Sequence, residues 1–505
     1  MTARRPWRGS AALLVLLLGL AVLPFAGLVP DPLATDSSLV VTGIRARAPT
    51  HVRLTQQVYA YLPYWQLDST TAGKLRYDLL TTIALFGIGV RANGDLDTST
   101  PGYRAYLGRD AVGVINAAHA RGVRVVPTFQ LFDSGGLHDL KAFLGKPGAQ
   151  QRFIDQALAL VVARKADGAN LDFEPVPDAL AGRFAAFLSR FRRALDRRVP
   201  DATLVVALGS GASGSTIARI APLVSQIFVM AYDYRTTRSG QAGPVAPLDA
   251  PGASVRGDLA RFLRHAAPGK IILGMPAYGY DWPVANRSPR AAVRTDAARA
   301  GSAFAVTWAA VSRFLALHPA LRVRYDPIAD APYFTYHDHD SGTYRQVWFE
   351  DRRSLSRKMD LALTTRIAGV GLWALDDAQE FSPIWDLLQG KLRAPAHRVI
   401  VRGSLFHVAS RGGKVVADIT ATVQNRGTVP EMGQLGWAVR DAKGRVVASG
   451  HVALTVDSLG ARRPLFHVTL GSAARLRAGT YRLTMVYGSG GRHWAAPVTM
   501  FRQRY

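Results

Sequence analysis

The strongest constraint on the fold of this chain is a regular alternation of short apolar runs with longer helical stretches between residues 57 and 390. The runs have the length and the β-branched or aromatic content of buried strands. Helical patterns, such as those at residues 149–165 and 180–197, separate most of them. Parallel strands need helical crossovers, so the alternation predicts an α/β fold, a (β/α)8 or TIM barrel. The predicted strands are residues 57–62, 80–88, 123–129, 168–174, 203–208, 226–232, 270–275 and 369–375.

Two stretches exceed what a plain barrel of about 250 residues requires. Residues 285–355, between the seventh and eighth predicted strands, predict an inserted lobe. From residue 395 onward helical signals nearly vanish, and alternating strands with Gly-rich turns predict an all-β immunoglobulin-like sandwich. We therefore expect a barrel domain over residues 56–392 and an accessory β-sandwich over residues 395–505.

The N-terminal segment has the features of a targeting signal. Three arginines, at positions 4, 5 and 8, precede an apolar run from residue 11 to 29. This charge bias directs the following chain out of the cytoplasm. The run approaches the ~20 residues that span a bilayer, exceeds a cleaved signal core and lacks a clear A-x-A site. We expect residues 1–30 to be an uncleaved membrane anchor, with a cleaved signal peptide as the alternative, and residues 31–55 to be a linker. The protein would then act in the cell envelope, outside the cytoplasm.

The composition excludes several kinds of chemistry. The chain of 505 residues has no cysteine, which excludes disulfides, thiolate catalysis and cysteine zinc sites. A formal net charge of +26 attracts polyanions, although an arginine-rich proteome would give the same bias. Residues 395–505 contain 16 Lys and Arg against 4 Asp and Glu, so the accessory domain is a candidate for binding an anionic envelope polymer. No zinc-finger or RNA-binding signature occurs, so nucleic acid is not an expected partner.

One predicted strand carries polar residues where an apolar core would be expected. In "DGANLDFEP", residues 167–175, the side chains of Asn170, Asp172 and Glu174 share one face, while Leu171 and Phe173 take the other. Burying carboxylates costs free energy unless they are paired or have a function. The strand is therefore a candidate carrier of catalytic groups.

Further candidates lie at the ends of other predicted strands, where barrel enzymes build their sites. Tyr232 and Asp233 end the sixth strand, Tyr278 follows the seventh and Trp373 ends the eighth. A crowded carboxyl group keeps its proton to higher pH, and aromatic faces stack on sugar rings. Together with Glu174 these residues predict a sugar-cleaving site. Each also has a structural explanation: a salt bridge, a core hydrogen bond or, for Trp373, filling of the barrel.

At these positions the chain resembles the family-18 glycoside hydrolases, the chitinase family. "DGANLDFE" is similar to their D-x-x-D-x-D-x-E signature, with Asn170 in place of the second aspartate. Similar motifs occur at "YAYLPYW" (59–65), "MAYDY" (230–234), "YDPIADAPYFTY" (325–336), "VWFEDRRSLSRKMDLA" (347–362) and "GLWALD" (371–376). With asparagine at this position, the motif resembles that of the spore-cortex and peptidoglycan-type subgroup more than that of classical chitinases.

The resemblance implies a retaining hydrolase of β-linked N-acetylglucosamine polysaccharides that works by substrate-assisted catalysis. Glu174 would protonate the leaving oxygen, and Asp172 would orient the acetamide nucleophile. Tyr232 would hydrogen-bond that acetamide, and Asp233 would support the sugar. The implied substrate-binding residues are Asn170, Tyr278, Trp373 and Trp65. Two alternatives stay open: a sugar-binding protein without catalysis, and an accessory protein of polysaccharide synthesis or export.

Two further motifs invite other functions. "GSGASG" (209–214) has the spacing of a dinucleotide fingerprint, but no nucleotide-binding βαβ unit surrounds it, so we interpret it as a strand–helix turn. "YHDHD" (336–340) has metal-ligating residue types, but it precedes a polar, Gly-bounded turn, so we interpret it as a hairpin tip. We expect neither a cofactor nor a metal.

Overall fold

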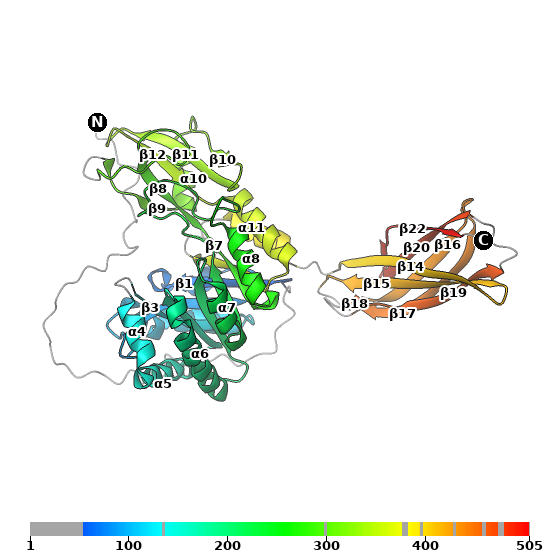
Figure 1. Ribbon diagram of the computed structural model, residues 1–505, viewed down its shortest axis with the longest axis horizontal. Coiled ribbons are helices and arrows are strands. Elements are labelled where there is room, and N and C mark those ends of the chain that lie inside the picture. The colour runs from blue at the N-terminus through cyan, green and yellow to red at the C-terminus, as the bar shows by residue number, and fades with distance from the viewer. Residues whose placement is uncertain are drawn as a thin grey trace. The chain divides into compact units, whose positions relative to one another are not determined.

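The computed structural model describes residues 54–133, 137–296, 300–375, 382–393, 397–427, 431–456, 461–472 and 479–503. Two compact units divide this chain, one ending at Leu392 and the other continuing from Arg393 (Figure 1). Within the described ranges no helix has the length and apolarity needed to cross a bilayer. The predicted anchor over residues 1–30 and nearly all of the predicted linker lie outside those ranges.

The first unit is a closed barrel of eight parallel strands, which confirms the predicted (β/α)8 fold. Its strands neighbour one another in the order β1-β13-β7-β6-β5-β4-β3-β2. They are buried almost without interruption, which is why the sequence shows apolar runs rather than alternation. Their bounds are β1 Gln57–Pro63, β2 Thr82–Gly89, β3 Arg124–Phe132, β4 Gly168–Glu174, β5 Thr203–Gly209, β6 Gln226–Met230, β7 Ile271–Pro276 and β13 Gly369–Trp373.

Helices follow the strands and cover the outside of the barrel (Figure 1). Helix α5 has proline as its first residue, and Ser213 caps α7 by accepting the backbone N–H of Thr216. Both are common ways to begin a helix. The helices are α1 Thr71–Lys74, α2 Pro101–Leu107, α3 Arg109–His119, α4 His138–Gly145, α5 Pro147–Ala163, α6 Asp178–Arg198, α7 Gly214–Ile220, α8 Val255–His265, α11 Arg352–Thr365 and α13 Ser382–Leu392.

The centre of the barrel is filled by the ring of Phe228 on β6. This ring packs against Tyr59 and Tyr61 of β1, with centroids 5.5 and 4.9 Å away. A side chain at Gly274 or at Gly371 would overlap the same ring. The two glycines therefore leave the space that one phenylalanine occupies, and the barrel beneath its mouth is a packed core rather than a pore.

The predicted inserted lobe is present, but it begins earlier than residue 285. Strand β8 (Tyr278–Val284) follows β7 almost directly and joins an antiparallel sheet in the order β10-β11-β12-β8-β9. Its alternating aromatic residues resemble a continuation of the barrel in sequence, because only strand pairing distinguishes the two. The other elements are β9 Phe304–Thr307, α10 Trp308–Leu317, β10 Arg324–Asp326, β11 Ala331–Asp338 and β12 Thr343–Trp348. Inside the sheet Arg345 pairs with the buried Asp281 at 2.9 Å.

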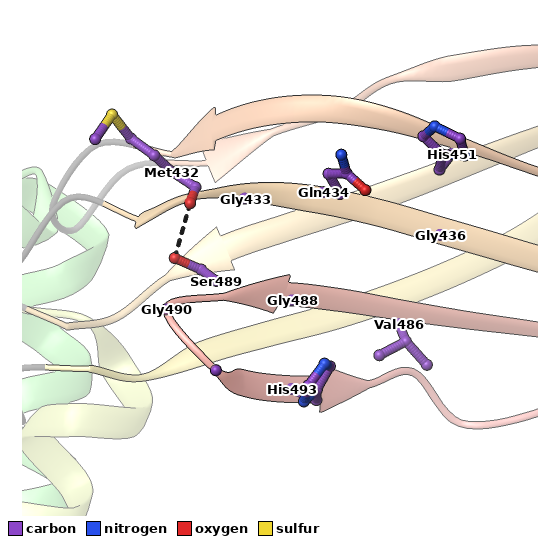
Figure 2. Close-up of a pocket in the computed structure, with 11 residues that line it drawn as sticks. Met432, Gly433, Gln434, Gly436, His451, Val486, Gly488, Ser489, Gly490 and His493 are labelled. Atoms are coloured by element: carbon purple, nitrogen blue, oxygen red, sulfur yellow. Dashed lines mark hydrogen bonds between the residues drawn. The ribbon is translucent and has the colours of Figure 1, made fainter.

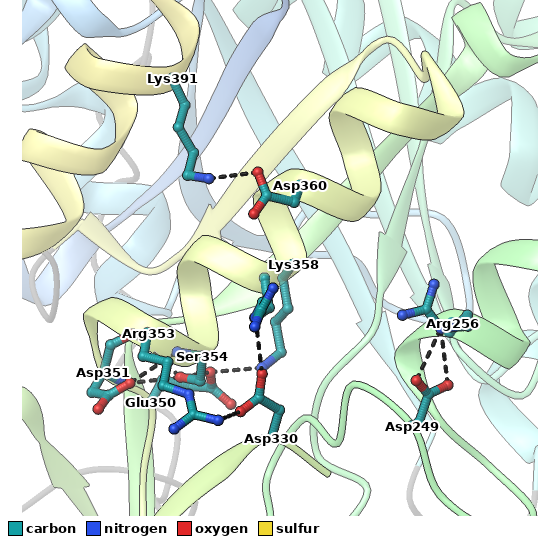
Figure 3. A network of polar contacts seen from close by, with 11 residues as sticks. Asp249, Arg256, Asp330, Glu350, Asp351, Arg353, Ser354, Lys358, Asp360 and Lys391 are labelled. Carbon is teal, nitrogen blue, oxygen red and sulfur yellow. Dashed lines mark hydrogen bonds and ion pairs between the residues drawn. The ribbon is translucent and has the colours of Figure 1, made fainter. Parts of the chain in front are cut away.

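A polar network fixes the point where the lobe returns to the barrel (Figure 3). The ammonium group of Lys358 on α11 lies 2.7 Å from the carboxylate of Glu350, and both side chains are fully buried. Ser354 donates to the same carboxylate oxygen at 2.6 Å. Arg353 pairs at 2.7 Å with Asp330, in the turn between β10 and β11. The network thus ties the lobe's turn to the start of α11.

The second unit consists of two antiparallel sheets, as expected for a β-sandwich (Figure 1). One sheet contains β14, β15, β18 and β19, and the other contains β17, β16, β20, β21 and β22. Buried residues from both sheets, including Val401, Ile419, Leu435 and Tyr487, form one core. The bounds are β14 Val399–Arg411, β15 Lys414–Asn425, β16 Glu431–Arg440, β17 Val446–Val456, β18 Ala461–Arg462, β19 Leu465–Ser472, β20 Gly479–Ser489, β21 Arg492–Ala495 and β22 Thr499–Gln503.

Candidate active site

The polar face of β4 points into the barrel. Its residues lie closer to the open end of the barrel as the strand proceeds. In register with the neighbouring strand, Asn170 lies beside Thr128, Asp172 beside Gln130, and Glu174 beside Phe132. Asn170 and Asp172 are buried, whereas Glu174, the last residue of the strand, is partly exposed. Only the last of the three polar groups therefore reaches the open end of the barrel.

Asp172 and Glu174 form a hydrogen-bonded pair of carboxyl groups. Burial raises the pKa of both, and the negative charge of Glu174 raises the pKa of Asp172 further. Hydrogen bonding to Asp172 opposes the rise at Glu174. Since two adjacent carboxylates repel each other, the pair retains a proton to higher pH than an isolated carboxyl group would.

A third carboxyl group, that of Asp233, is held in place by two tyrosines. The hydroxyl groups of Tyr278 and Tyr280 donate to the same oxygen of Asp233 at 2.6 and 2.9 Å. Burial raises the pKa of Asp233, while these two hydrogen bonds oppose the rise. The negative charge of Asp233 adds to the pKa of Glu174, so the two groups lie within electrostatic reach of each other.

Tyr232 lies within electrostatic reach of all three carboxyl groups. Burial raises the pKa of its hydroxyl well above the usual value, and Asp172, Glu174 and Asp233 each raise it further. The ring of Tyr232 packs edge-on against Tyr278, with centroids 6.4 Å apart. The phenol is therefore a neutral hydrogen-bond donor beside three acidic groups.

Aromatic side chains from β13, β2, β3 and the segment after β1 pack together. Trp373, at the end of β13, packs edge-on against Phe86 with centroids 4.8 Å apart. Trp65, in the short 3-10 helix Tyr64–Gln66, packs against the same ring at 6.0 Å, and Phe132 stacks on it at 6.4 Å. Trp65 is 41% exposed and Phe132 47%. Exposed aromatic surface of this kind is typical of a ligand-binding site.

Two residues of the signature motif lie deeper than the mouth. The amide of Asn170 is fully buried and donates to the hydroxyls of Tyr61 and Thr128 at 3.1 and 3.2 Å. It therefore contacts the layer beneath Asp172 rather than the open cleft. Asp167 precedes β4 at the opposite end of the strand. Its carboxylate accepts the backbone N–H of Val125 at 2.8 Å and contacts His119 at the same distance, which ties the base of β4 to its neighbours.

The motifs "GSGASG" (209–214) and "YHDHD" (336–340) both lie where side-chain hydrogen bonds hold a turn or loop. The loop after β5 is held by Asp178, which accepts hydrogen bonds from Ser213, Ser215 and Thr216. Residues 336–340 end β11 and enter a turn, where Asp338 accepts from Ser341 at 2.6 Å. Within the described ranges no three His, Asp or Glu side chains gather as a group of potential metal ligands.

Sequence reasoning missed two residues of this site. Tyr280 holds Asp233 together with Tyr278, and the Tyr-Gly-Tyr spacing, which places both on one strand face, could have revealed it. Phe132 faces Glu174 across β3 and β4. It was missed because the third strand was predicted to end at residue 129, and β3 extends three residues further.

Comparison with known proteins identifies the barrel. A family model described as glycosyl hydrolases family 18 matches residues 127–378. The chain is 28% identical over 306 residues to the putative sporulation-specific glycosylase YdhD of Bacillus subtilis, covering 58% of this chain and 66% of that protein. It is also 28% identical over 252 residues to a cortical fragment-lytic enzyme of Bacillus anthracis, covering 47% of this chain and 53% of that protein. The chain thus spans less than two thirds of either relative.

Solved structures agree on the fold. The spore cortex-lytic enzyme SleL of Bacillus cereus superposes with a TM-score of 0.52 at 22% identity, covering 66% of this chain and 73% of that one. The shared part has about the length of the barrel with its lobe.

Proposed function

Because the chain belongs to family 18 of the glycosyl hydrolases, we propose that it is a retaining hydrolase of β-linked N-acetylglucosamine polysaccharides. The observation that carries the proposal is the partly exposed Glu174 at the end of β4, which lies beside the buried Asp172 and whose pKa is raised by burial. In this proposal Glu174 is the general acid that protonates the leaving oxygen. Burial raises its pKa, so its acidic form persists to higher pH than that of an exposed glutamate.

The nucleophile in this proposal is the acetamide group of the substrate. Two-carboxylate retaining enzymes place their carboxyl groups on opposite sides of the sugar, about 5–5.5 Å apart. Asp172 is hydrogen-bonded to Glu174 and therefore lies on the same side as the acid. It is badly placed for attack from the opposite face but well placed to orient the acetamide and to stabilise its developing positive charge.

Tyr232 and Asp233 complete the proposed catalytic group. The phenol of Tyr232, which lies within electrostatic reach of the three acids, would donate to the acetamide oxygen. Asp233, fixed by Tyr278 and Tyr280, would support the sugar. Asn170 would act from beneath, by holding the layer on which Asp172 rests. Trp65 and Trp373, together with Phe132, would provide the apolar surface on which sugar rings stack.

The proposed substrate is peptidoglycan or a related envelope polysaccharide rather than crystalline chitin. Relatives named for sporulation and for cortex fragments support this choice, as does the asparagine at position 170. We place the protein outside the cytoplasm, held at the membrane by residues 1–30 or released after their cleavage. The basic second unit would add attraction to an anionic envelope polymer.

A digestion panel tests the proposal. Purified protein would be incubated with peptidoglycan, chitin oligomers and poly-N-acetylglucosamine, and the products would be identified by mass spectrometry. We expect cleavage next to N-acetylglucosamine with retention of the anomeric configuration, and none by Glu174→Gln. A folded protein that binds these glycans and cleaves none of them would instead be the sugar-binding relative.

The N-acetyl group provides a sharper test of the nucleophile. Oligomers with and without the acetyl group at the cleaved sugar would be compared, and a thiazoline mimic of the cyclised intermediate would be tested as an inhibitor. We expect activity only on the acetylated sugar and inhibition by the mimic. Equal rates on both oligomers, or a glycosyl ester trapped on a protein carboxylate, would exclude the acetamide mechanism.

A further inference from the structure

The outer face of one sheet in the second unit contains a shallow groove with a glycine floor (Figure 2). The groove has a volume of about 500 Å³ and crosses β16, β17, β20 and β21. Gly436 and Gly488 lie on neighbouring strands, where the absence of side chains lowers the surface. The polar and apolar side chains that surround it are Met432, Gln434, His451, Val486, Ser489 and His493.

The outward direction of this face follows from the burial pattern. On β16, Leu435 and Val439 belong to the core, so the even-numbered residues of that strand point outward. On β20, Leu483 and Tyr487 belong to the core, and again the even-numbered residues point outward. The groove is therefore formed by the solvent-facing half of each strand.

Two arginines on this face repel each other. Arg440 of β16 lies directly opposite Arg482 of β20, and both are exposed. Like charges in such a cross-strand pair destabilise a sheet. The outward positions of β16, β17, β20 and β21 contain no Asp or Glu that would offset them. A concentration of positive charge that costs stability is the expected signature of a surface that binds an anion.

The spacing of the cationic groups selects a long ligand. Arg440 lies four residues beyond Gly436 on β16, and Arg482 lies four residues before Val486 on β20, in each case on the same outward face as the groove. At about 3.4 Å per residue, this arginine pair lies roughly 14 Å beyond the nearest lining residues of the groove. Only an extended chain reaches from the groove to the arginine pair, and it would pass the imidazoles of His493 and His451 on the way.

The side chains of this face also favour a charged ligand over a neutral sugar. The same outward positions contain no Phe, Tyr or Trp on which a sugar ring could stack. In contrast, the barrel mouth exposes Trp65 and Phe132. The amide and imidazole groups of the groove, and the guanidinium groups of the arginine pair beyond it, are hydrogen-bond partners for phosphate oxygens.

We propose that this groove binds an extended polyanion with repeating phosphodiester groups, an anionic glycopolymer of the cell envelope. The envelope setting rests on the proposed function, whereas the binding site rests on the sheet alone. Occupied in this way, the groove holds the enzyme on the polymer that accompanies its substrate.

The test measures binding of poly(glycerol phosphate) to the full-length protein at two salt concentrations. Arg440→Gln with Arg482→Gln should weaken binding by about tenfold or more, since two charged hydrogen-bonding groups are lost. The matched control, Arg402→Gln with Lys414→Gln, removes the same charge from exposed positions on the other sheet. It should leave the affinity nearly unchanged. Equal losses in both variants would show a general charge effect and would overturn the site.

A second variant fills the groove without changing charge. A Cβ at Gly436 would meet no atom closer than 3.8 Å, so Gly436→Leu fits the fold while occupying the floor. It should abolish binding of the polymer and keep the melting temperature. Unchanged binding would overturn the proposal.

Comparison ligands distinguish the other occupants. Inorganic phosphate, duplex DNA, anionic phospholipid vesicles and chitin oligomers would be measured against the same variants. Binding of any of these as tightly as poly(glycerol phosphate), with the same loss in Arg440→Gln/Arg482→Gln, would replace the proposed ligand by that class. Hydrolysis of glycan oligomers, followed in the same samples, should be unaffected by the groove variants. A protein that binds the polymer but hydrolyses nothing would contradict the proposed function and leave the groove standing.

Discussion

The candidate site in the barrel unit and the groove face of the second unit differ in how deeply their charged side chains are buried. In the barrel unit, the acidic groups of the candidate site and of the lobe junction are largely buried and lie close to another titratable group, as for Glu174 with Asp172 and Glu350 with Lys358. On the groove face of the second unit, arginines are exposed and face one another. Burial makes the chemistry of a single group decisive, because its pKa and its partner are fixed by position. Exposure leaves each charge weak but lets several act together on a large ligand.

The largest expected effect comes from substituting Glu174, the member of the carboxyl pair that lies at the mouth of the barrel. Glu174→Gln keeps the shape of the side chain but removes its dissociable proton, so kcat should fall about 10²- to 10⁴-fold. Circular dichroism and a thermal melt would serve as folding controls. Substantial turnover by a folded variant would exclude Glu174 as the general acid.

Stability sharpens the contrast between buried and exposed pairs within the barrel unit. Lys358→Met leaves the carboxylate of Glu350 buried without its cation and should lower the free energy of unfolding by about 3–5 kcal/mol. Lys391→Met removes the partner of the half-exposed Asp360 (Figure 3) and should cost about 0–1 kcal/mol. Urea unfolding of the two variants provides the measurement. Similar losses would mean that burial does not set the strength of these pairs.

A neutral donor among the acids should matter to the transition state more than to binding. Tyr232→Phe removes one hydroxyl that burial and three carboxyl groups keep protonated. We expect kcat to fall about 10²- to 10³-fold, as for other lost donors to a developing charge, with a small change in KM. Steady-state kinetics on acetylated oligomers measures both. A change confined to KM would make Tyr232 a binding residue only.

The pH profile tests the coupling between the acids. Burial raises the pKa of Glu174, its hydrogen bond to Asp172 opposes the rise, and the charge of Asp233 raises it further. The acidic form is the active one, so kcat/KM should fall as pH increases through this raised pKa. In Asp233→Asn the added negative charge is gone, so the alkaline limb should move to lower pH. A shift to higher pH, or none, would contradict the electrostatic link.

The smallest effect concerns the exposed arginines. Arg482→Gln relieves the repulsion from Arg440 and should raise the free energy of unfolding of the second unit by about 0.2–1 kcal/mol. Arg445→Gln is the control, since Arg445 pairs with Asp441 at 2.9 Å and its loss should not stabilise the domain. Differential scanning calorimetry would detect the difference. Destabilisation by Arg482→Gln would show that the arginine pair is not a stability cost.

The amino-acid sequence by itself determined the eight barrel strands, because parallel strands buried on both faces appear as continuous apolar runs. It also determined that Asn170, Asp172 and Glu174 share a face, since side chains alternate along any strand. The sequence did not determine which strands pair with one another. Pairing alone assigns β8 to the inserted lobe, sets Phe132 beside Glu174 and brings Arg440 opposite Arg482.

Tertiary structure also decided what each polar residue contacts. Asn170 is sealed beneath the site and Asp167 lies at the other end of the strand, although both belong to one eight-residue motif. Tyr280 and Tyr278 meet Asp233 across 45 or more residues of chain. A local pattern states which side chains share a strand face. The depth of burial and the partner of each depend on packing between distant segments, and these two quantities set the pKa of a carboxyl group.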